Sequence, residues 1–538
     1  MELYHNSRDI NYRKPFGAVH CKGSVELSLK APDADYALLR LYCEEAGEGI
    51  LEPDECINGI YTWRFSVPDN DIVLWYFFVC GIGDNTYCYG NNGDLGGEGR
   101  IYYPGETPDS FQITVYHPFE VPKWYKEGII YQIFPDRFFR ADGIDTCGRR
   151  IEEWNTLPYY IKNGDGSIAE WNFWGGNLKG ITEKLDYIRS LGADIIYLNP
   201  IFAARSNHRY DTADYFKIDP LLGTEDDFKK LCAEAKKRGM RIILDGVFNH
   251  TGIDSDYYSN HQDWYLKNED GSIKCWWGVK DLPETDESNP EFAEMICGEN
   301  GVLRHWIRRG ASGWRLDVAD ELPNEFLCRI REAVKAEDPD ALLIGEVWDD
   351  ASYKIDYGHR MRFLGGKQLD GVMNYPLRND IIEYTRGEIS AADFAERQMA
   401  RMEKYPAEAF YGCFNTLDSH DRERIITMLG SDQAVKFATA LLFVLPGVPV
   451  IYYGDEKGLE GGKDPDNRRP MPWGEEGNED LSDHYKAMCA MRNSLKSLKN
   501  GNLKAFATAE GELIIERTYG AETSRFSFDA KSLLFGIA

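Results

Sequence analysis

The chain has 538 residues, several times the usual length of one domain, and its hydrophobic fraction of 43% is ample for a large core. Its 61 Lys and Arg residues against 89 Asp and Glu give a formal net charge of −28, which repels nucleic acid and anionic lipid surfaces. We therefore expect no nucleic-acid partner. The 12 cysteines are scattered without a CxxC pair, which indicates reduced thiols rather than a disulfide framework or a zinc site.

The start of the chain carries charges and has no apolar segment of the kind that a signal peptide contains. No apolar run approaches the roughly 18 residues that a membrane-spanning helix needs. We therefore expect a cytoplasmic protein with no membrane partner.

Residues 1–118 consist of short alternating segments separated by Gly, Asn and Asp turns, of which 24–29 and 72–79 are the clearest. Alternation of apolar and polar residues between turn signals is typical of antiparallel strands. We predict an N-terminal β-sandwich domain, of the kind that binds carbohydrate in other proteins, over this range.

Residues 119–480 change to short apolar runs that alternate with amphipathic stretches at helical spacing, such as 177–191 and 224–238. The runs are Ile129–Ile133, Asp194–Leu198, Arg241–Asp245, Gly313–Asp317, Ala341–Gly345, Gly371–Asn374, Phe410–Leu417 and Val448–Tyr452. Eight such units predict an α/β fold, a (β/α)8 TIM barrel with its active site at the C-terminal ends of the strands.

Two further segments complete the predicted organisation. The connection after the third strand, residues 250–290, is long and contains Trp264, Trp276 and Trp277, so we predict a functional loop subdomain there. Residues 481–538 predict a last helix over about 482–498 and a short C-terminal β-module, because 512–516 alternates like a strand.

Three carboxylates follow predicted barrel strands: Asp317, Glu346 and Asp421. A single acid at a strand end is more often a helix cap or a rim ion pair. Three in one barrel favour acetal hydrolysis with retention, which needs one carboxylate as nucleophile and another as acid. The third carboxylate would stabilise positive charge in the transition state.

Other polar residues lie at equivalent strand ends. Arg315 precedes Asp317 by two residues, so strand alternation directs both side chains into the barrel, where Arg315 would hold Asp317 ionised. Glu346 follows an apolar strand and precedes Trp348, a setting that would raise its pKa and keep it protonated. His250 and His420 are expected to donate hydrogen bonds to substrate hydroxyls.

Four ordered segments resemble the signature regions of the α-amylase family of glycoside hydrolases: Asp245–His250, Gly313–Glu321, Gly345–Trp348 and Phe414–Asp421. The resemblance covers nearly the whole barrel. It implies that Asp317 is the nucleophile, that Glu346 is the general acid/base and that Asp421 binds the sugar hydroxyls and distorts the ring. The implied mechanism is retaining, with the two reacting carboxyls roughly 5–5.5 Å apart.

Three further segments are similar to the cyclomaltodextrinase, neopullulanase and maltogenic amylase group: 206–215, 282–286 and 464–473. In that group a β-sandwich precedes the barrel. The resemblance implies that Tyr210 stacks on the sugar at the cleavage site, that Asp464 and Arg468 hold its hydroxyls, and that Trp348 lines the acceptor side.

The chain departs from the group at Asp320, where Asn is usual, and at Asp349, where His is common. Both positions should border the acceptor subsites, so product pattern and transfer activity stay open.

No cofactor is expected for the chemistry. The group often binds calcium in the loop after the first barrel strand, where Asp142, Asp145 and Asp165 offer oxygen ligands. Arg140 in the same loop would oppose a cation.

The expected function is a retaining hydrolase of α-1,4-glucosidic bonds in maltooligosaccharides, cyclodextrins or pullulan, with some α-1,6 cleavage and transglycosylation. The alternatives are an exo-acting α-glucosidase and, in another class, a non-catalytic sugar-binding relative. By the same resemblance we expect a homodimer through the N-terminal domain, with the strand around 75–78 as a candidate contact.

Overall fold

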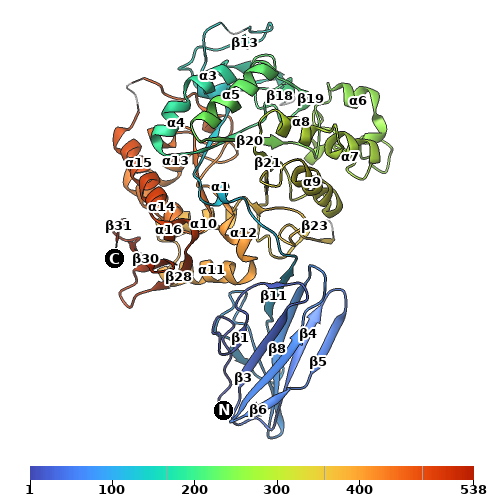
Figure 1. Cartoon of the computed structure of the whole chain (residues 1–538), viewed down its shortest axis with the longest axis vertical. Helices are drawn as coiled ribbons and strands as arrows, with labels where there is room; N and C mark the ends of the chain where they lie inside the picture. The colour runs from blue at the N-terminus through green and yellow to red at the C-terminus, as the bar shows by residue number, and fades with distance from the viewer. Residues whose placement is uncertain (144, 165–166, 357, 475–476, 538) are drawn as a thin grey trace.

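The computed structural model describes residues 1–538 except 144, 165–166, 357, 475–476 and 538. Figure 1 shows a sheet domain built from the first part of the chain, a barrel surrounded by helices, and a small C-terminal sheet at the side of the barrel. Among the described residues, no helix is both long enough and apolar enough to cross a membrane.

The N-terminal domain contains two sheets that face each other, as predicted. One sheet has the order β1–β3–β7–β6, with bounds β1 Arg13–Lys14, β3 Ser24–Lys30, β6 Glu55–Ile57 and β7 Ile60–Ser66. The other joins β2 Val19–His20, β4 Tyr36–Cys43, β5 Gly47–Leu51, β8 Val73–Ile82, β9 Asn85–Gly90, β10 Arg100–Tyr102 and β11 Phe111–Tyr116. Alternate residues of these strands form an apolar core of their own, separate from that of the barrel.

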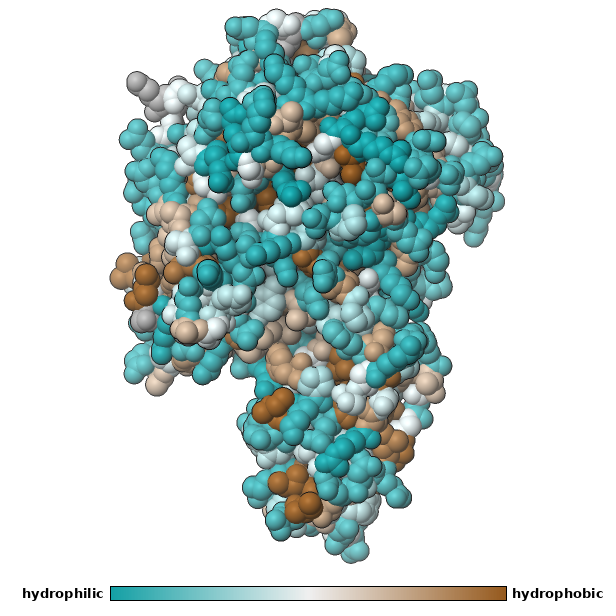
Figure 2. Space-filling view, viewed as in Figure 1, coloured by the Kyte–Doolittle hydropathy of each residue, from teal (hydrophilic) through white to brown (hydrophobic). Residues whose placement is uncertain are grey.

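The strand that we considered for a dimer contact lies in the middle of this sandwich. Tyr76 and Phe78 are fully buried in its core, and the ring of Trp75 packs edge-on against Tyr353 of the barrel domain at 5.1 Å. These three rings are therefore engaged within the chain. The surface in Figure 2 is largely hydrophilic, with apolar residues exposed in small groups on the N-terminal domain and beside the C-terminal sheet.

All eight predicted barrel strands are present. The parallel sheet runs β25–β22–β21–β20–β17–β12–β27–β26, and a parallel bridge between Met373 and Phe414 joins its two ends. The strands are β12 Ile130–Ile133, β17 Ile195–Leu198, β20 Arg241–Gly246, β21 Gly313–Leu316, β22 Leu342–Gly345, β25 Gly371–Val372, β26 Phe414–Asn415 and β27 Val448–Tyr452. The predicted (β/α)8 barrel is confirmed.

Helices cover the outside of the barrel with their apolar faces inward. The longer ones are α4 Leu185–Leu191, α5 Glu225–Lys237, α7 Pro290–Cys297, α8 Val302–Arg308, α9 Asn324–Glu337, α10 Tyr375–Thr385, α11 Ala391–Lys404, α14 Asp432–Val444 and α15 Glu479–Ser494. The shorter ones are α1 Lys123–Lys126, α2 Pro135–Phe138, α3 Leu178–Glu183, α6 Asp256–Asn260, α12 Ala407–Tyr411, α13 Ile425–Leu429 and α16 Lys496–Asn500.

Two helix predictions can be compared in detail. The helix predicted from Thr224 is confirmed as α5, with the reciprocal Thr224–Asp227 capping box. The stretch 177–191, predicted as one helix, is divided into α3 and α4 because Lys184 leaves helical geometry. Its ammonium lies 4.0 Å and 4.2 Å from the ring centres of Phe139 and Trp473, and these two cation–π contacts accompany the break.

Shorter pieces lie between these elements. They are the strands β13 Arg150–Ile151, β14 Ile161–Lys162, β15 Ile168–Glu170, β16 Asn172–Phe173, β18 Phe202–Ala204, β19 Thr212–Ile218, β23 Lys354–Asp356 and β24 His359–Met361, and the 3₁₀ turns η1 Gln262–Trp264, η2 Trp276–Gly278, η3 Asp455–Lys457 and η4 Asp466–Arg468. The turns η1 and η2 lie in the predicted loop subdomain.

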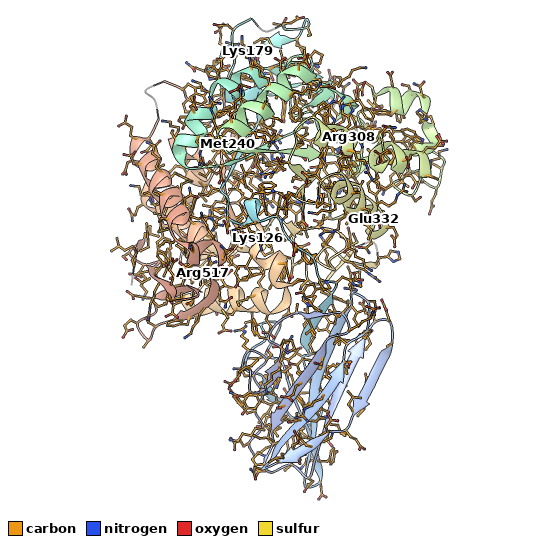
Figure 3. All side chains as sticks on the ribbon, in the orientation of Figure 1. Lys126, Lys179, Met240, Arg308, Glu332 and Arg517 are labelled. Atoms are coloured by element: carbon orange, nitrogen blue, oxygen red, sulfur yellow. The ribbon has the colours of Figure 1, made fainter. Side chains whose placement is uncertain are left out.

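The C-terminal sheet has the order β28–β29–β30–β31, with bounds Asn502–Ala507, Leu513–Tyr519, Glu522–Asp529 and Leu534–Ile537. Its buried residues Phe526 and Phe528 belong to the barrel's core. Arg517 of β29 is fully buried where this sheet meets the barrel (Figure 3), and it donates hydrogen bonds to the carbonyl oxygens of Val444 and Gly501. The C-terminal sheet is thus an extension of the barrel's packing.

Candidate active site

The three predicted catalytic carboxylates lie at the C-terminal end of the barrel. Asp317 directly follows β21, and Glu346 directly follows β22. Asp421 lies in the loop after β26. Because these strands are parallel members of one barrel, their following residues converge at one rim.

Arg315 holds two of these carboxylates together. Its Nη1 lies 2.8 Å from Oδ1 of Asp317 and 2.8 Å from Oδ1 of Asp245, and its Nη2 lies 3.0 Å from Oε1 of Glu346. The guanidinium is fully buried at the floor of the site. The predicted approach of Arg315 and Asp317 is therefore confirmed as a contact, and one cation serves three acids.

The backbone at Val318, next to Asp317, has a strained conformation and contacts Glu346. Val318 has φ = 48°, a left-handed conformation that β-branched residues rarely adopt. In this conformation its N–H donates a hydrogen bond of 3.0 Å to Oε2 of Glu346. Strain of this kind persists where surrounding contacts hold it, and here it links Asp317 and Glu346 through the backbone.

Burial controls the protonation of both carboxylates. It raises the pKa of Glu346 to about 7, with the charges of Asp421 and Asp245 adding to the rise and Arg315 opposing it. A Glu with this pKa is poised as a proton donor near neutral pH, as predicted. Burial also raises the pKa of Asp317, against the effect of Arg315. Arg315 lowers the pKa of Asp317, as the sequence analysis expected, but burial and the charges of Glu346 and Asp245 act against it.

Asp421 differs in its surroundings. Its side chain is 31% exposed, and its carboxylate lies 2.9 Å from Nε2 of His420 and 3.5 Å from Nη2 of Arg468. Partial burial would raise its pKa, but His420 and Arg468 outweigh that effect and hold the pKa below its ordinary value. Asp421 is thus an ionised acceptor open to the cleft.

Tyr210 and His420 form one wall of the cleft. Their rings stack at a centroid distance of 5.2 Å and an angle of 6°, and the Tyr210 hydroxyl lies 2.5 Å from Nε2 of His420. The same hydroxyl donates to Oδ2 of Asp245 at 2.9 Å. These contacts fix the orientation of the Tyr210 ring, which the resemblance assigns to stacking on a sugar.

His250 lies near the backbone of Tyr210 and stacks on Trp276 at 4.9 Å. Burial lowers its pKa to about 3, so the imidazole is neutral. Its Nε2 is buried and has no hydrogen-bond partner within the described part of the chain. Buried polar atoms are normally paired, so this nitrogen is available to a bound hydroxyl group.

Asp464 and Arg468 form an ion pair in the wall of the cleft. Nη1 of Arg468 lies 2.8 Å from Oδ1 of Asp464, and its Nε donates to the carbonyl oxygen of His420 at 2.9 Å. The Tyr160 hydroxyl donates to the other Asp464 oxygen at 2.6 Å. This arrangement presents a fixed carboxylate and guanidinium toward the cleft.

Trp348 lines the same pocket. Its ring stacks on Tyr375 at 3.8 Å and 6°, and the guanidinium carbon of Arg422 lies 4.3 Å from its ring centre. The main-chain N–H of Trp348 donates to Oδ2 of Asp320 at 3.0 Å. Lys354 Nζ lies 2.8 Å from the second oxygen of Asp320, so both oxygens of this carboxylate are engaged.

Asp349 is the second position at which the chain departs from the group. It belongs to the same ion-pair network, since Lys354 Nζ also lies 3.1 Å from Oδ2 of Asp349. One lysine therefore bridges the two aspartates that replace Asn and His. The two substitutions form one charged network rather than two independent changes.

An aromatic rim stands over this side of the cleft. Trp276 and Trp277 stack at 5.1 Å, and the indole N–H of Trp277 donates to Oε1 of Glu321 at 2.9 Å. Trp277 has φ = 49° and is 79% exposed. An exposed flat ring held in this way is a platform for the apolar face of a sugar.

These residues enclose one pocket of about 580 Å³. Nine of the ten predicted site residues line it: Asp317, Glu346, Asp421, Tyr210, His250, Trp348, His420, Asp464 and Arg468. Arg315 lies beneath the floor. The other nine lining residues were not among the predicted site residues: Tyr160, His208, Trp276, Trp277, Leu282, Val318, Asp320, Glu321 and Arg422. His208 and Arg422 adjoin assigned residues, whereas Tyr160 lies in a loop without periodic signal.

The predicted calcium ligands are only partly described. Asp165 lies outside the described residues, and Oδ1 of Asp145 accepts the N–H of Cys147 at 2.9 Å. Arg140 donates to the carbonyl oxygens of Glu152 and Trp174. Within the described ranges, no group of three or more His, Cys, Asp or Glu side chains is arranged to hold a metal ion. The described part of this loop, with Asp142 and Asp145, does not form a calcium donor set, and calcium binding stays a prediction.

Comparison with known proteins agrees with this geometry. The family described as "Alpha amylase, catalytic domain" matches residues 132–505, most of the chain. The chain belongs to the α-amylase family. This match begins in the first barrel strand and ends in the C-terminal sheet, so it includes every element that carries a predicted site residue.

Individual members of the α-amylase family are similar over most of the chain. An amylopullulanase of Thermoanaerobacterium saccharolyticum is 36% identical over 94% of this chain and 45% of its own length. Neopullulanase 2 of Thermoactinomyces vulgaris is 40% identical over 76% of this chain and 72% of its own length. A solved structure named cyclomaltodextrinase is 29% identical, with a TM-score of 0.69 over 98% of this chain and 91% of that one. The chain spans less than half the length of the amylopullulanases that it matches.

Proposed function

We propose that the chain is a retaining glycoside hydrolase that cleaves α-1,4-glucosidic bonds in maltooligosaccharides, cyclodextrins or pullulan. The observation that carries this proposal is the buried Arg315, which contacts both Asp317 and Glu346 while the pKa of Glu346 rises to about 7. A double displacement at an acetal carbon requires two neighbouring carboxyl groups, one as nucleophile and one as acid, and Arg315 holds such a pair together here.

In the first step the Glu346 carboxyl gives its proton to the glycosidic oxygen, and the bond from that oxygen to the anomeric carbon breaks. The Asp317 carboxylate forms an ester bond to the same carbon on its opposite face. Arg315 stabilises the carboxylate form of Asp317 that attacks, and Asp421 accepts hydrogen bonds from ring hydroxyls. The leaving oligosaccharide departs with the proton of Glu346.

In the second step the Glu346 carboxylate removes a proton from water, and the oxygen attacks the anomeric carbon. The ester bond to Asp317 breaks, and configuration is retained after two inversions. A sugar hydroxyl in place of water gives transglycosylation. The names of similar proteins, which include amylopullulanase and neopullulanase, support substrates with both α-1,4 and α-1,6 bonds.

The test is a product profile after separate incubation with maltoheptaose, β-cyclodextrin, pullulan and soluble starch. We expect maltose or panose, with cyclodextrin consumed faster than starch. Glucose alone from maltoheptaose, with cyclodextrin untouched, would replace this proposal with an exo-acting α-glucosidase. No turnover of any substrate, with retained binding, would favour the non-catalytic relative.

A homodimer through the N-terminal domain and a cytoplasmic location remain part of this proposal. The exposed apolar side chains of that domain include Ile10, Ile50, Ile57 and Ile60, and they supply a candidate contact in place of the engaged ring of Trp75. Sedimentation at micromolar concentration tests the dimer, because a monomer alone would exclude it.

A further inference from the structure

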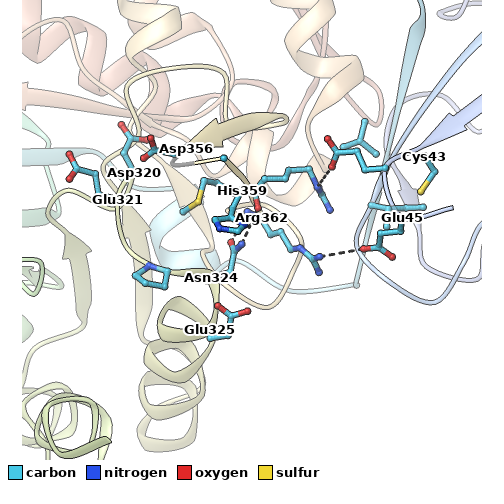
Figure 4. Close-up of a pocket in the computed structure, with 16 residues that line it drawn as sticks. Cys43, Glu45, Asp320, Glu321, Asn324, Glu325, Asp356, His359 and Arg362 are labelled. Atoms are coloured by element: carbon cyan, nitrogen blue, oxygen red, sulfur yellow. Dashed lines mark hydrogen bonds and ion pairs between the residues drawn. The ribbon is translucent and has the colours of Figure 1, made fainter. Parts of the chain in front are cut away.

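A second pocket, of about 550 Å³, lies between the N-terminal domain and the barrel (Figure 4). Its N-terminal wall is the turn after β4, with Glu44 and Glu45. Its other wall is the start of α9 and the hairpin of β23 and β24, with Glu325 and His359. Both domains therefore build this junction pocket.

The junction pocket begins where the catalytic pocket ends. Asp320 and Glu321 line both. Asp320 accepts the main-chain N–H of Trp348, and Glu321 accepts the indole N–H of Trp277, so the shared residues lie beside these two tryptophans. Asp464 and Arg468 line the catalytic pocket but not the junction pocket.

The resemblance assigns Trp348 to the acceptor side of the cleft, and Asp320 and Glu321 beside it line both pockets, which gives a direction to a long substrate. When Asp464 and Arg468 hold the sugar whose anomeric carbon reacts, the leaving part of the chain passes Trp348. Its next units meet Asp320 and Glu321 and enter the space that follows them. The space that follows is the junction pocket, and its volume lies within the range of ligand sites.

The charges on the junction pocket suit a neutral ligand. Arg362 lies 3.3 Å from both Glu45 and Asp71, and Arg360 lies 3.6 Å from Glu44. These guanidiniums are thus neutralised by their partners, and the acids that line the pocket repel anions. Carboxylate and imidazole groups such as those of Glu325 and His359 exchange hydrogen bonds readily with uncharged hydroxyls.

We propose that the junction pocket is a saccharide-binding site that takes the reducing-end units of a long α-glucan, so that the N-terminal domain contributes to substrate binding within its own chain. This inference rests on the proposed function and adds to it a site outside the catalytic pocket. It makes chain-length preference a property of the junction between the two domains.

The test compares maltoheptaose with maltotriose, because only the longer substrate reaches the junction pocket from the cleavage site. Glu325→Ala and His359→Ala should each lower kcat/KM for maltoheptaose about three- to tenfold, the usual effect of one lost hydrogen bond. The value for maltotriose should stay within about twofold. With a label at the reducing end, the bond cleaved in maltoheptaose should shift, because units at that end lose their contacts.

Glu332→Ala is the matched control, since Glu332 is exposed on the same helix two turns further along and outside the pocket (Figure 3). Glu332→Ala should leave kcat/KM unchanged for both maltoheptaose and maltotriose. Equal values for Glu325→Ala, His359→Ala and the control would overturn the junction site while leaving the proposed function intact. Equal losses on both substrates would also overturn it, since they indicate general damage. A wild-type chain that neither binds nor cleaves maltoheptaose would refute both proposals.

Discussion

Nη1 of Arg315 lies 2.8 Å from Oδ1 of Asp317, and the exposed fractions of the two side chains are 0% and 9%. The same guanidinium contacts Glu346 at 3.0 Å. A buried charge without partners is costly, so each member of this cluster depends on the others. Substitutions here must therefore preserve volume and hydrogen bonding to report on chemistry alone.

Asp317→Asn meets that condition. The amide cannot attack the anomeric carbon, so turnover of every α-glucoside should fall at least about a thousandfold. Binding of maltoheptaose, measured by calorimetry, should stay within about threefold because the ring contacts at Asp464 and Arg468 remain. Asp226→Asn, at a carboxylate that is 93% exposed on α5, is the control and should keep full activity. Appreciable residual turnover would refute the nucleophile assignment.

The pH dependence follows from Glu346. Because burial raises its pKa to about 7, kcat/KM should fall as the pH rises through about 7 and the acid loses its proton. A substrate whose leaving group needs no proton, such as an α-glucosyl fluoride, should lack this limb for the glycosylation step. A limb at the same pH with that substrate would argue against Glu346 as the acid.

Glu346 also links stability to pH. Its pKa is higher in the folded chain than in the unfolded chain, so the folded state binds more protons between about pH 4.5 and 7. The stabilisation from this group is complete below about pH 4.5 and is lost as the pH rises to about 7, by a total of roughly 3 kcal/mol. Glu346→Gln should flatten the wild-type decline in denaturant midpoint over this range. An unchanged slope would show that burial at Glu346 is not the cause.

The ion pair between Lys354 and Asp320 predicts a change in the ratio of transfer to hydrolysis that a second substitution should undo. Lys354→Met leaves Asp320, which is 8% exposed, without its cation, and should disturb the Trp348 main chain that this carboxylate holds. We expect the ratio of transfer to hydrolysis to change about three- to tenfold. The double variant Lys354→Met with Asp320→Asn should recover much of the loss, since Asn accepts the same N–H without a charge.

Lys335→Met is the control for that experiment. Lys335 Nζ lies 2.7 Å from buried Asp370 and is 19% exposed, close to the 15% of Lys354, but it does not line the catalytic pocket. It should lower the melting temperature without altering the product ratio. A changed ratio in this variant would mean that stability alone governs transfer.

Arg517 predicts a purely structural effect. Its fully buried side chain donates to the carbonyl oxygens of Val444 and Gly501, so Arg517→Met leaves both without these donors. The free energy of unfolding should fall by about 2–4 kcal/mol. Arg525→Met on the next strand, 45% exposed, should change it by less than about 0.5 kcal/mol. Equal effects would contradict the assigned role of Arg517.

The sequence by itself predicted the fold and placed the three candidate carboxylates at one end of the barrel. Apolar periodicity marked all eight barrel strands, and the acids after Leu316, Gly345 and Ser419–His420 had to meet because parallel strands end at one rim. Local patterns suffice for this, since strand direction and side-chain alternation are properties of the backbone.

The tertiary structure decided what depends on contacts between distant segments. Burial opposes the effect of Arg315 on the pKa of Asp317, Lys354 pairs with Asp320 and Asp349, and the Tyr160 hydroxyl contacts Asp464 from a loop with no periodic signal. The junction pocket likewise needs Glu44 beside Arg360, residues more than 300 positions apart. Desolvation and long-range ion pairs depend on the complete packing of the chain, and no spacing within one segment encodes them.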